Sequence, residues 1–301
     1  MSLLFAGIDG GQSSTVAAIA DETGRILARG RAGPADEIGV GASSTRLHDA
    51  LHAALGDACA RAGLAAECEF AVVVAGVSGY EGRVYGRKPE FPAQRFALLH
   101  DAPIAHAGAL AGAPGVIAIA GTGSVVYARD ERNSERTFGG WGPLFGDEGS
   151  GFGIVREGLA GVMQGHDAGL RQRESAAACA FFGVRTLREL ARAIYAGEIT
   201  RDKLASFAPV ALRFPFFRSI ARRGADRLAG LIRTAAEPVG RPDISLLGGL
   251  FADPLFRTRV SRRVLELVPG SRIVDPRYEP ALGALLLAYR EIGRAIPELS
   301  E

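Results

Sequence analysis

The sequence has few cysteines and no long apolar run. Its 301 residues include 3 cysteines, Cys59, Cys68 and Cys179, which are too few for a disulfide framework and show no C-x-x-C spacing typical of zinc, iron-sulfur or redox sites. No window reaches the roughly 18 apolar residues that a membrane helix requires, and the first residues lack the positive segment of a signal peptide. We therefore expect a soluble, cytoplasmic protein with no membrane partner.

The sequence also lacks an excess of charge of one sign. Its 35 basic and 33 acidic residues give a net charge of +2, too even a balance for a dedicated nucleic-acid binder. No G-x-x-x-x-G-K-[S/T] motif is present, which excludes a P-loop enzyme. Hydrophobic residues make up 48% of the chain, enough for a packed core, and the length favours two domains of about 150 residues.

Apolar runs separated by glycine and aspartate turns predict an α/β protein. The spacing of the runs predicts three antiparallel strands first, and then a helix, two further strands and an alanine-rich helix. These elements are expected at Leu3–Ile8, Thr15–Ala20, Arg25–Arg29, Leu47–Ala62, Phe70–Ala75, Arg95–Leu99 and Ile104–Ala111.

The opening pattern of strand, small-residue turn and strand occurs a second time. Val116–Ala120, the turn Gly121–Ser124 and Val125–Ala128 repeat it about 112 positions later, a period too long for a solenoid. We therefore predict two related halves. The remainder is predicted as a helical stretch, a last strand and a closing helix, over Gly158–Arg241, Ile244–Leu247 and Pro280–Ile292.

The two small-residue turns could bind phosphate. In the first, Asp9-Gly10-Gly11 is followed by hydroxyl residues up to Thr15, and glycine permits the close backbone approach that a phosphate needs. Each turn alone could equally be an ordinary hairpin. Their equivalent positions in the two halves favour phosphate binding.

The segment Gly139–Gly153 is rich in glycine and contains the only tryptophan. A flexible linker is one interpretation. Trp141, Phe145 and Phe152 favour burial instead, and the pair Asp147-Glu148 suggests a binding role.

Five short motifs occur in order along the chain: Asp9–Thr15, His100-Asp101-Ala102, Gly121–Ser124, Leu247–Phe251 and Pro280–Ala284. With these motifs the chain resembles the actin-like ATPase and sugar kinase superfamily, and within it the N-acetylglucosamine kinase group of the BadF/BadG/BcrA/BcrD-type ATPase family. The resemblance implies an α/β fold of two ribonuclease H-like (actin-like ATPase) domains related by duplication, with an interdomain cleft. It implies an N-terminal domain of residues 1–105 plus 281–301 and a C-terminal domain of residues 106–280 with a helical insertion.

The resemblance also implies a role for each motif, with ATP and Mg²⁺ as cofactors. Asp101 is expected to be the general base for the sugar hydroxyl, although it could instead cap the following helix. Asp9 is expected to hold Mg²⁺ through water. The expected nucleotide ligands are Gly10, Gly11, Gln12, Ser13, Thr15, Gly121, Thr122, Gly123, Gly248 and Gly249. The expected sugar ligands are Asp36, Thr122, Gly140, Trp141 and Asp147.

The implied function is an ATP-dependent kinase that phosphorylates the 6-hydroxyl of an amino sugar, with N-acetylglucosamine as the first candidate. No nucleic-acid partner is expected, and the chain could form a homodimer. Asp36 stands where relatives commonly carry Asn, and Val125 and Ala75 also depart from the pattern. Because a carboxylate only accepts hydrogen bonds, glucosamine is an alternative substrate. A second alternative is an ATPase activator of a CoA-ester reductase or dehydratase, although the three cysteines lack the spacing of its cluster ligands.

Overall fold

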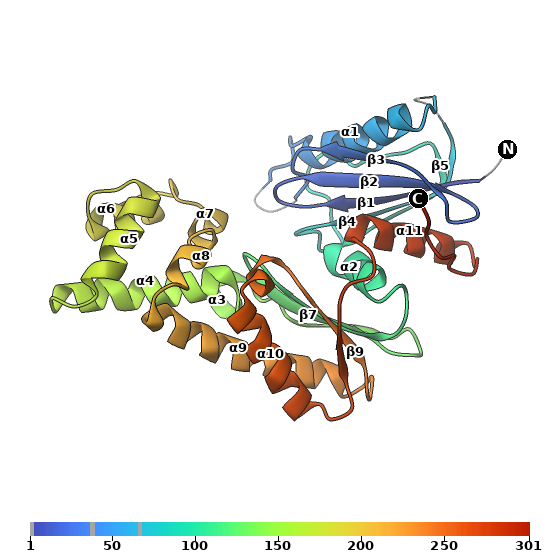
Figure 1. The fold of residues 1–301 in the computed structure, drawn as a ribbon. Helices are drawn as coiled ribbons and strands as arrows, with labels where there is room; N and C mark the ends of the chain where they lie inside the picture. The colour runs from blue at the N-terminus through green and yellow to red at the C-terminus, as the bar shows by residue number, and fades with distance from the viewer. Residues whose placement is uncertain (1–2, 37–39, 66–67) are drawn as a thin grey trace. The chain divides into compact units, whose positions relative to one another are not determined.

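The computed structural model describes residues 3–36, 40–65 and 68–301. It divides into two compact units, one of Met1–Ala113 with Asp275–Glu301 and the other of Pro114–Val274. Figure 1 shows that each unit is built on one sheet. The division falls in the loop after helix α2 (Asp101–Ala109), whereas the boundary expected after residue 105 falls inside that helix.

The first unit contains a five-stranded mixed sheet in the order β3-β2-β1-β4-β5. Its first three strands are antiparallel, as the opening apolar runs predict, and the last two run parallel to β1. The strands are β1 (Leu4–Gly10), β2 (Thr15–Asp21), β3 (Ile26–Ala32), β4 (Phe70–Val77) and β5 (Ala93–His100).

Helices cover both faces of this sheet, with α1 (Arg46–Arg61) on one face and α2 and α11 (Pro280–Glu291) on the other (Figure 1). Side chains alternate along β1, so Phe5 packs in the α11 core while Ala6 and Ile8 pack in the α1 core. At Gly7, a Cβ atom would collide with the backbone of α11. Glycine therefore lets the last helix lie directly on β1, the strand that carries Asp9.

The second unit repeats the topology of the first. Its sheet has the order β10-β9-β6-β7-β8, in which β7 pairs antiparallel with β6, β8 pairs antiparallel with β7, and β9 is the parallel neighbour of β6. This arrangement matches the first sheet strand for strand and confirms the predicted duplication. The strands are β6 (Gly115–Ala120), β7 (Ser124–Arg129), β8 (Glu135–Gly139), β9 (Asp243–Leu247) and β10 (Arg272–Val274).

The two edge strands of this second sheet were not among the predicted strands. β8 is largely exposed and β10 has three residues, so neither gives a buried apolar run. Both are recognisable only from their pairing with β7 and β9.

Between β8 and β9 lies the predicted helical stretch, which begins earlier than expected, at Gly142. Its longest helix, α9, packs on the sheet and against α4 and α10. No helix in the described part of the chain is long and apolar enough to cross a membrane. The remaining elements are α3 (Gly142–Phe145), α4 (Gly151–Asp167), α5 (Gln172–Phe182), α6 (Leu187–Tyr195), α7 (Arg201–Ala205), α8 (Ala208–Ala211), α9 (Pro215–Ala236), η1 (Gly249–Ala252) and α10 (Pro254–Leu267).

Candidate functional site

The first turn, between β1 and β2, is held by its neighbours on two sides. Ser78 N donates to Gly10 O at 2.9 Å, and Ala35 N donates to Gly11 O at 3.0 Å. A Cβ atom on Gly10 would lie 3.1 Å from both the Ala35 Cβ and a Val77 methyl group, tighter than ordinary packing. The turn is therefore fixed beside the carboxyl end of β4 and the segment that leads to Asp36.

The hydroxyl of Thr15 is not free for a phosphate in this structure. Thr15 is fully buried, and its Oγ1 donates to Gly33 O at 2.7 Å. The hydroxyl faces inward and stabilises the turn, and the nucleotide role expected for Thr15 stays a prediction. Gln12 and Ser13 are exposed, and Gly11 N donates to Ser14 O at 2.9 Å.

Asp101 is the first residue of α2, immediately after β5. One carboxylate oxygen lies 2.7 Å from His100 Nδ1, and the other accepts from Ser78 Oγ at 2.5 Å. Burial raises the pKa of Asp101, but the hydrogen bonds from His100 and Ser78 and the attraction of His100 outweigh it and hold this pKa below its ordinary value. Asp101 is thus a carboxylate at neutral pH, a state in which it can accept a proton.

The alternative role of Asp101 as a helix cap does not match the structure. The N-cap position belongs to His100, and α2 begins at Asp101 itself. His100 Nδ1 lies 3.2 Å from Ala102 N and 2.7 Å from the Asp101 carboxylate. Nδ1 accepts from Ala102 N when it is unprotonated or donates to Asp101 when it is protonated, but not both at once. The hydrogen bond to Asp101 raises the pKa of His100.

Asp9, at the end of β1, lies in an environment that a cation would stabilise. Burial raises the pKa of Asp9 to about 7, and repulsion from the carboxylates of Asp101 and Glu279 adds to the rise. Carboxylate oxygens are the ligands that Mg²⁺ prefers, usually together with several water molecules. Within the described ranges, no cluster of three or more His, Cys, Asp or Glu side chains could hold a metal directly. A carboxylate that a cation would stabilise fits Mg²⁺, and the expectation that Asp9 holds it through water stays a prediction.

The second turn, between β6 and β7, rests on the start of α4. Gly151 N donates to Gly121 O at 2.8 Å, and Phe152 N donates to Thr122 O at 3.1 Å. Within the turn, Gly121 N donates to Gly123 O at 2.9 Å. No atom lies within 4 Å of the position that a Cβ on Gly121 would take, so this side of the turn is open to a ligand.

Asp147 supports this turn from inside the unit. It is a buried non-glycine residue in the left-handed region, with φ 66°. Its Oδ1 accepts from Ser124 N at 3.2 Å, and its Oδ2 accepts from Arg201 Nη2 at 2.6 Å. Both oxygens of this buried side chain have protein partners here, and the sugar contact expected for Asp147 stays a prediction.

The segment before Asp147 leaves its large apolar side chains exposed, which corrects the expected burial. Trp141 is 76% exposed and Phe145 82% exposed. The cause is a series of left-handed residues, with φ 70° at both Gly139 and Gly140 and 78° at Gly142, which turns the chain away from the sheet at the end of β8. Phe152, at the start of α4, is partly buried.

Gly248 and Gly249 follow β9 and differ in what they require. Gly248 has φ 102°, and a Cβ there would collide with the backbone of Ala120, one residue before the second turn. Gly249 has open space at the same position. Gly248 is thus needed for packing beside the turn, while Gly249 presents uncovered backbone.

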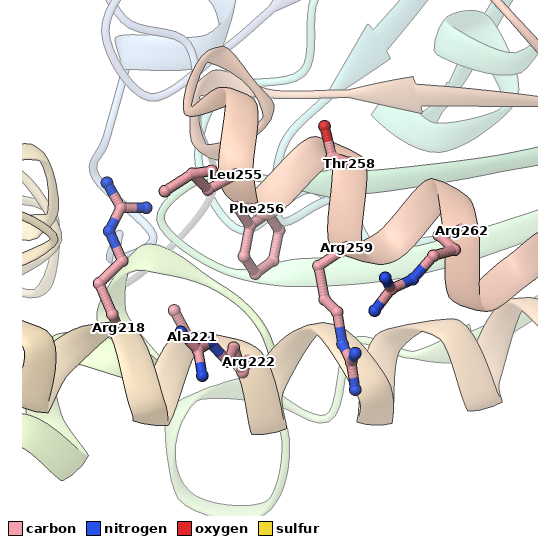
Figure 2. Close-up of a pocket in the computed structure, with 8 residues that line it drawn as sticks. All are labelled: Arg218, Ala221, Arg222, Leu255, Phe256, Thr258, Arg259 and Arg262. Atoms are coloured by element: carbon pink, nitrogen blue, oxygen red, sulfur yellow. The ribbon is translucent and has the colours of Figure 1, made fainter.

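A groove between α9 and α10 lies beyond this glycine pair (Figure 2). Its arginines include Arg218 and Arg259, which pair with Asp253 and Asp226. None of the residues predicted from the sequence lines it, so we leave it outside the candidate site. Its lining residues are Arg218, Ala221, Arg222, Leu255, Phe256, Thr258, Arg259 and Arg262.

Asp36 is buried and pairs with Arg46 at the start of α1. Arg46 Nη1 lies 3.2 Å from Asp36 Oδ1. The Ala35 N to Gly11 O hydrogen bond brings Asp36 next to the first turn. Its expected position near the phosphate residues of the first unit is therefore consistent with the geometry, although its charge already has a protein partner.

Some residues of these clusters, among them Ser78, Glu279 and Arg201, were not among the predicted ligands. Ser78 donates a hydrogen bond to Asp101, and the Glu279 carboxylate repels that of Asp9. Arg201 donates to the Asp147 carboxylate. Ser78 follows a buried strand next to β1 and β5, a position where parallel sheets often place binding residues. Arg201 gives no comparable signal, because it lies 54 positions from its partner.

Comparison with known proteins supports the resemblance in the motifs. The sequence is 25% identical over 209 residues to an N-acetylmuramic acid/N-acetylglucosamine kinase of Clostridium acetobutylicum, covering 65% of this chain and 68% of that protein. It is also 25% identical over 188 residues to an N-acetyl-D-glucosamine kinase of Dictyostelium discoideum, covering 58% and 59%.

A solved structure from Chromobacterium violaceum, provisionally named as an N-acetylglucosamine kinase, matches the fold with a TM-score of 0.76 and 26% identity over 95% of this chain and 99% of that one. These likenesses confirm the predicted pair of duplicated ribonuclease H-like domains of the actin-like ATPase fold. The model of the BadF/BadG/BcrA/BcrD ATPase family matches residues 6–288. The chain therefore belongs to the BadF/BadG/BcrA/BcrD ATPase family.

Proposed function

We propose that the protein is an ATP-dependent sugar kinase that transfers the γ-phosphoryl group to the 6-hydroxyl of an amino sugar, with N-acetylglucosamine as the first candidate. The observation that carries this proposal is Asp101, a partly exposed carboxylate held by His100 and Ser78 beside the first glycine turn. The names of the kinase relatives support the substrate class.

Phosphoryl transfer depends mainly on positioning and on neutralising charge. In the proposed reaction, Asp101 accepts the proton of the sugar 6-hydroxyl as its oxygen bonds to the γ-phosphorus, while the bond from that phosphorus to the β–γ bridging oxygen breaks and ADP leaves. Its two hydrogen bonds fix the carboxylate in one orientation, which a general base requires. His100 and Ser78 act through Asp101 and are positioning residues.

The two small-residue turns are the proposed phosphate ligands. The backbone around Gly11 and the exposed Gln12 and Ser13 belong to the first, and Gly121 to Gly123 form the second. Mg²⁺, when bound near Asp9, would neutralise phosphate charge. Gly249 is proposed to lie against the nucleoside, because its backbone has no close neighbour on one side.

Glucosamine is a second candidate substrate because of Asp36. A buried carboxylate can accept hydrogen bonds from hydroxyls and attract an ammonium group, whereas it cannot donate to an acetamido carbonyl. Arg46 compensates part of this charge, so the preference depends on whether Arg46 remains paired when sugar binds.

The test is ADP release measured with N-acetylglucosamine, glucosamine, glucose and N-acetylmannosamine, compared as kcat/KM. We expect an amino sugar to give the highest value, with a phosphomonoester at C6 in the NMR spectrum of the product. ADP release that does not depend on any sugar would contradict the proposal and favour the ATPase activator alternative.

A further inference from the structure

Arg201 reaches the second turn from a distant part of the chain. It begins α7, and its Nη2 lies 2.6 Å from Asp147 Oδ2. A Cβ atom on Gly123 would collide with the same nitrogen, so the guanidinium lies directly against the turn. Its side chain is 29% exposed whereas that of Asp147 is 3% exposed, so the arginine is the member of the pair that a ligand can reach.

The guanidinium has donors to spare. An arginine carries five N–H donors in a planar fork that matches phosphate oxygens. Among the described residues, the buried Nε of Arg201 has no hydrogen-bond partner, and the single carboxylate contact uses Nη2. The ring of Phe152 lies 5.6 Å from the guanidinium carbon and limits its movement on one side.

Nothing else in the turn neutralises a phosphate. Gly121, Thr122, Gly123 and Ser124 offer backbone N–H groups and hydroxyls but no positive charge. Charge-assisted hydrogen bonds from arginine to phosphate are about twice as strong as neutral ones. A cation in contact with the turn is therefore well placed to distinguish a nucleoside triphosphate from a diphosphate.

We propose that Arg201 binds the terminal phosphoryl group of the nucleotide and that Asp147 is its partner only in the absence of nucleotide. When Arg201 turns to the phosphate, Asp147 Oδ2 becomes free to accept a hydrogen bond from a sugar hydroxyl, while Oδ1 keeps Ser124 N. Because a buried carboxylate without a partner is costly, the phosphate and the sugar bind more tightly together than separately. This inference rests on the proposed nucleotide role of the second turn.

The first test measures the affinity of the Mg²⁺ complexes of ADP and of a non-hydrolysable ATP analogue by calorimetry, without sugar. Arg201→Met should weaken binding of the ATP analogue by about tenfold or more and binding of ADP by less than about threefold. Arg259→Met is the matched control, because Arg259 pairs with Asp226 through two hydrogen bonds of 2.7 and 2.8 Å in the same unit and does not contact the turn. It should leave both affinities unchanged.

Equal affinities of wild type and Arg201→Met for the ATP analogue would overturn the inference, as would an equal loss for ADP and the analogue. Arg201→Lys, which keeps the charge, should retain part of the preference for the analogue and covers the case in which the methionine variant does not fold. No sugar is present in this assay. The two proposals can therefore fail separately. If the wild-type enzyme phosphorylates no sugar, the proposed function is contradicted. If Arg201→Met nevertheless removes the preference for the ATP analogue, the role of Arg201 is supported.

Discussion

Ser78 Oγ donates a hydrogen bond of 2.5 Å to Asp101 Oδ2, and the backbone N–H of the same serine donates to Gly10 O in the first glycine turn. One residue at the end of β4 thus connects the proposed general base to a proposed phosphate turn. The connection is rigid, because β4 is the buried neighbour of both β1 and β5. It predicts that small changes at Ser78 affect turnover.

The first prediction concerns the base itself. Asp101→Asn keeps the shape and the hydrogen bond from Ser78 but cannot accept the proton, so kcat should fall by about 10² to 10⁴. Sugar affinity, measured by calorimetry, should change much less. A turnover close to that of wild type would show that Asp101 is not the base.

The second prediction concerns Ser78. Ser78→Ala removes one hydrogen bond to Asp101 but keeps the backbone bond to Gly10. The kcat should therefore fall by about three- to tenfold, the equivalent of one ordinary hydrogen bond. The KM for ATP should stay within about twofold. Ser78→Thr restores the hydroxyl and should recover part of the loss. If KM for ATP rises and kcat does not change, Ser78 supports only the turn.

The central strands could be predicted from the sequence because each is a largely buried apolar run that ends at a turn. Residues on β4 alternate between two cores, so that all of Phe70–Val77 is buried, and such runs are visible without knowledge of the fold. The edge strands β8 and β10 were missed because their formation depends on pairing with distant segments.

The candidate site was predictable only where its residues lie in a local motif. Asp9 and Gly10 end a strand, and Gly121 and Asp101 each follow one. The partner of each side chain was not predictable, because it comes from elsewhere in the chain. The Thr15 hydroxyl donates to Gly33 O, and Arg201 donates to the Asp147 carboxylate. Residue type predicted the location, and tertiary contacts decided which atoms face a ligand.

The third prediction concerns sugar preference. If Asp36 contacts the substituent at C2, Asp36→Asn should shift the ratio of kcat/KM toward N-acetylglucosamine over glucosamine by about tenfold, or roughly 1.4 kcal/mol. Arg46→Gln is the control, because it breaks the same ion pair but keeps the carboxylate. An unchanged ratio in Asp36→Asn, with stability lowered as much as in Arg46→Gln, would mean that Asp36 only holds Arg46.

The fourth prediction separates two adjacent glycines. Gly248→Ala places a Cβ against the Ala120 backbone at φ 102°, so the second unit should lose at least about 1–3 kcal/mol of stability. Gly249→Ala adds the same methyl group in open space and should cost less than about 1 kcal/mol. Urea unfolding of both variants checks this, and equal losses would contradict the packing role of Gly248.

The last prediction concerns Asp9, whose carboxylate is repelled by those of Asp101 and Glu279. Burial and repulsion from Asp101 and Glu279 disfavour the charge on Asp9, so Asp9→Asn should raise the melting temperature of the nucleotide-free protein. A gain of 1 kcal/mol corresponds to about 2–4 °C in domains of 150–250 residues. The same change removes the proposed anchor for the Mg²⁺ hydration shell, so half-maximal activity should require at least about tenfold more Mg²⁺.

Asp21→Asn is the control in the same unit. Asp21 accepts hydrogen bonds from Thr23, so the loss of its carboxylate should lower the melting temperature and leave the Mg²⁺ requirement unchanged. A melting temperature that falls equally in both variants would mean that the Asp9 carboxylate stabilises the fold, and it would remove the argument that this site needs a cation.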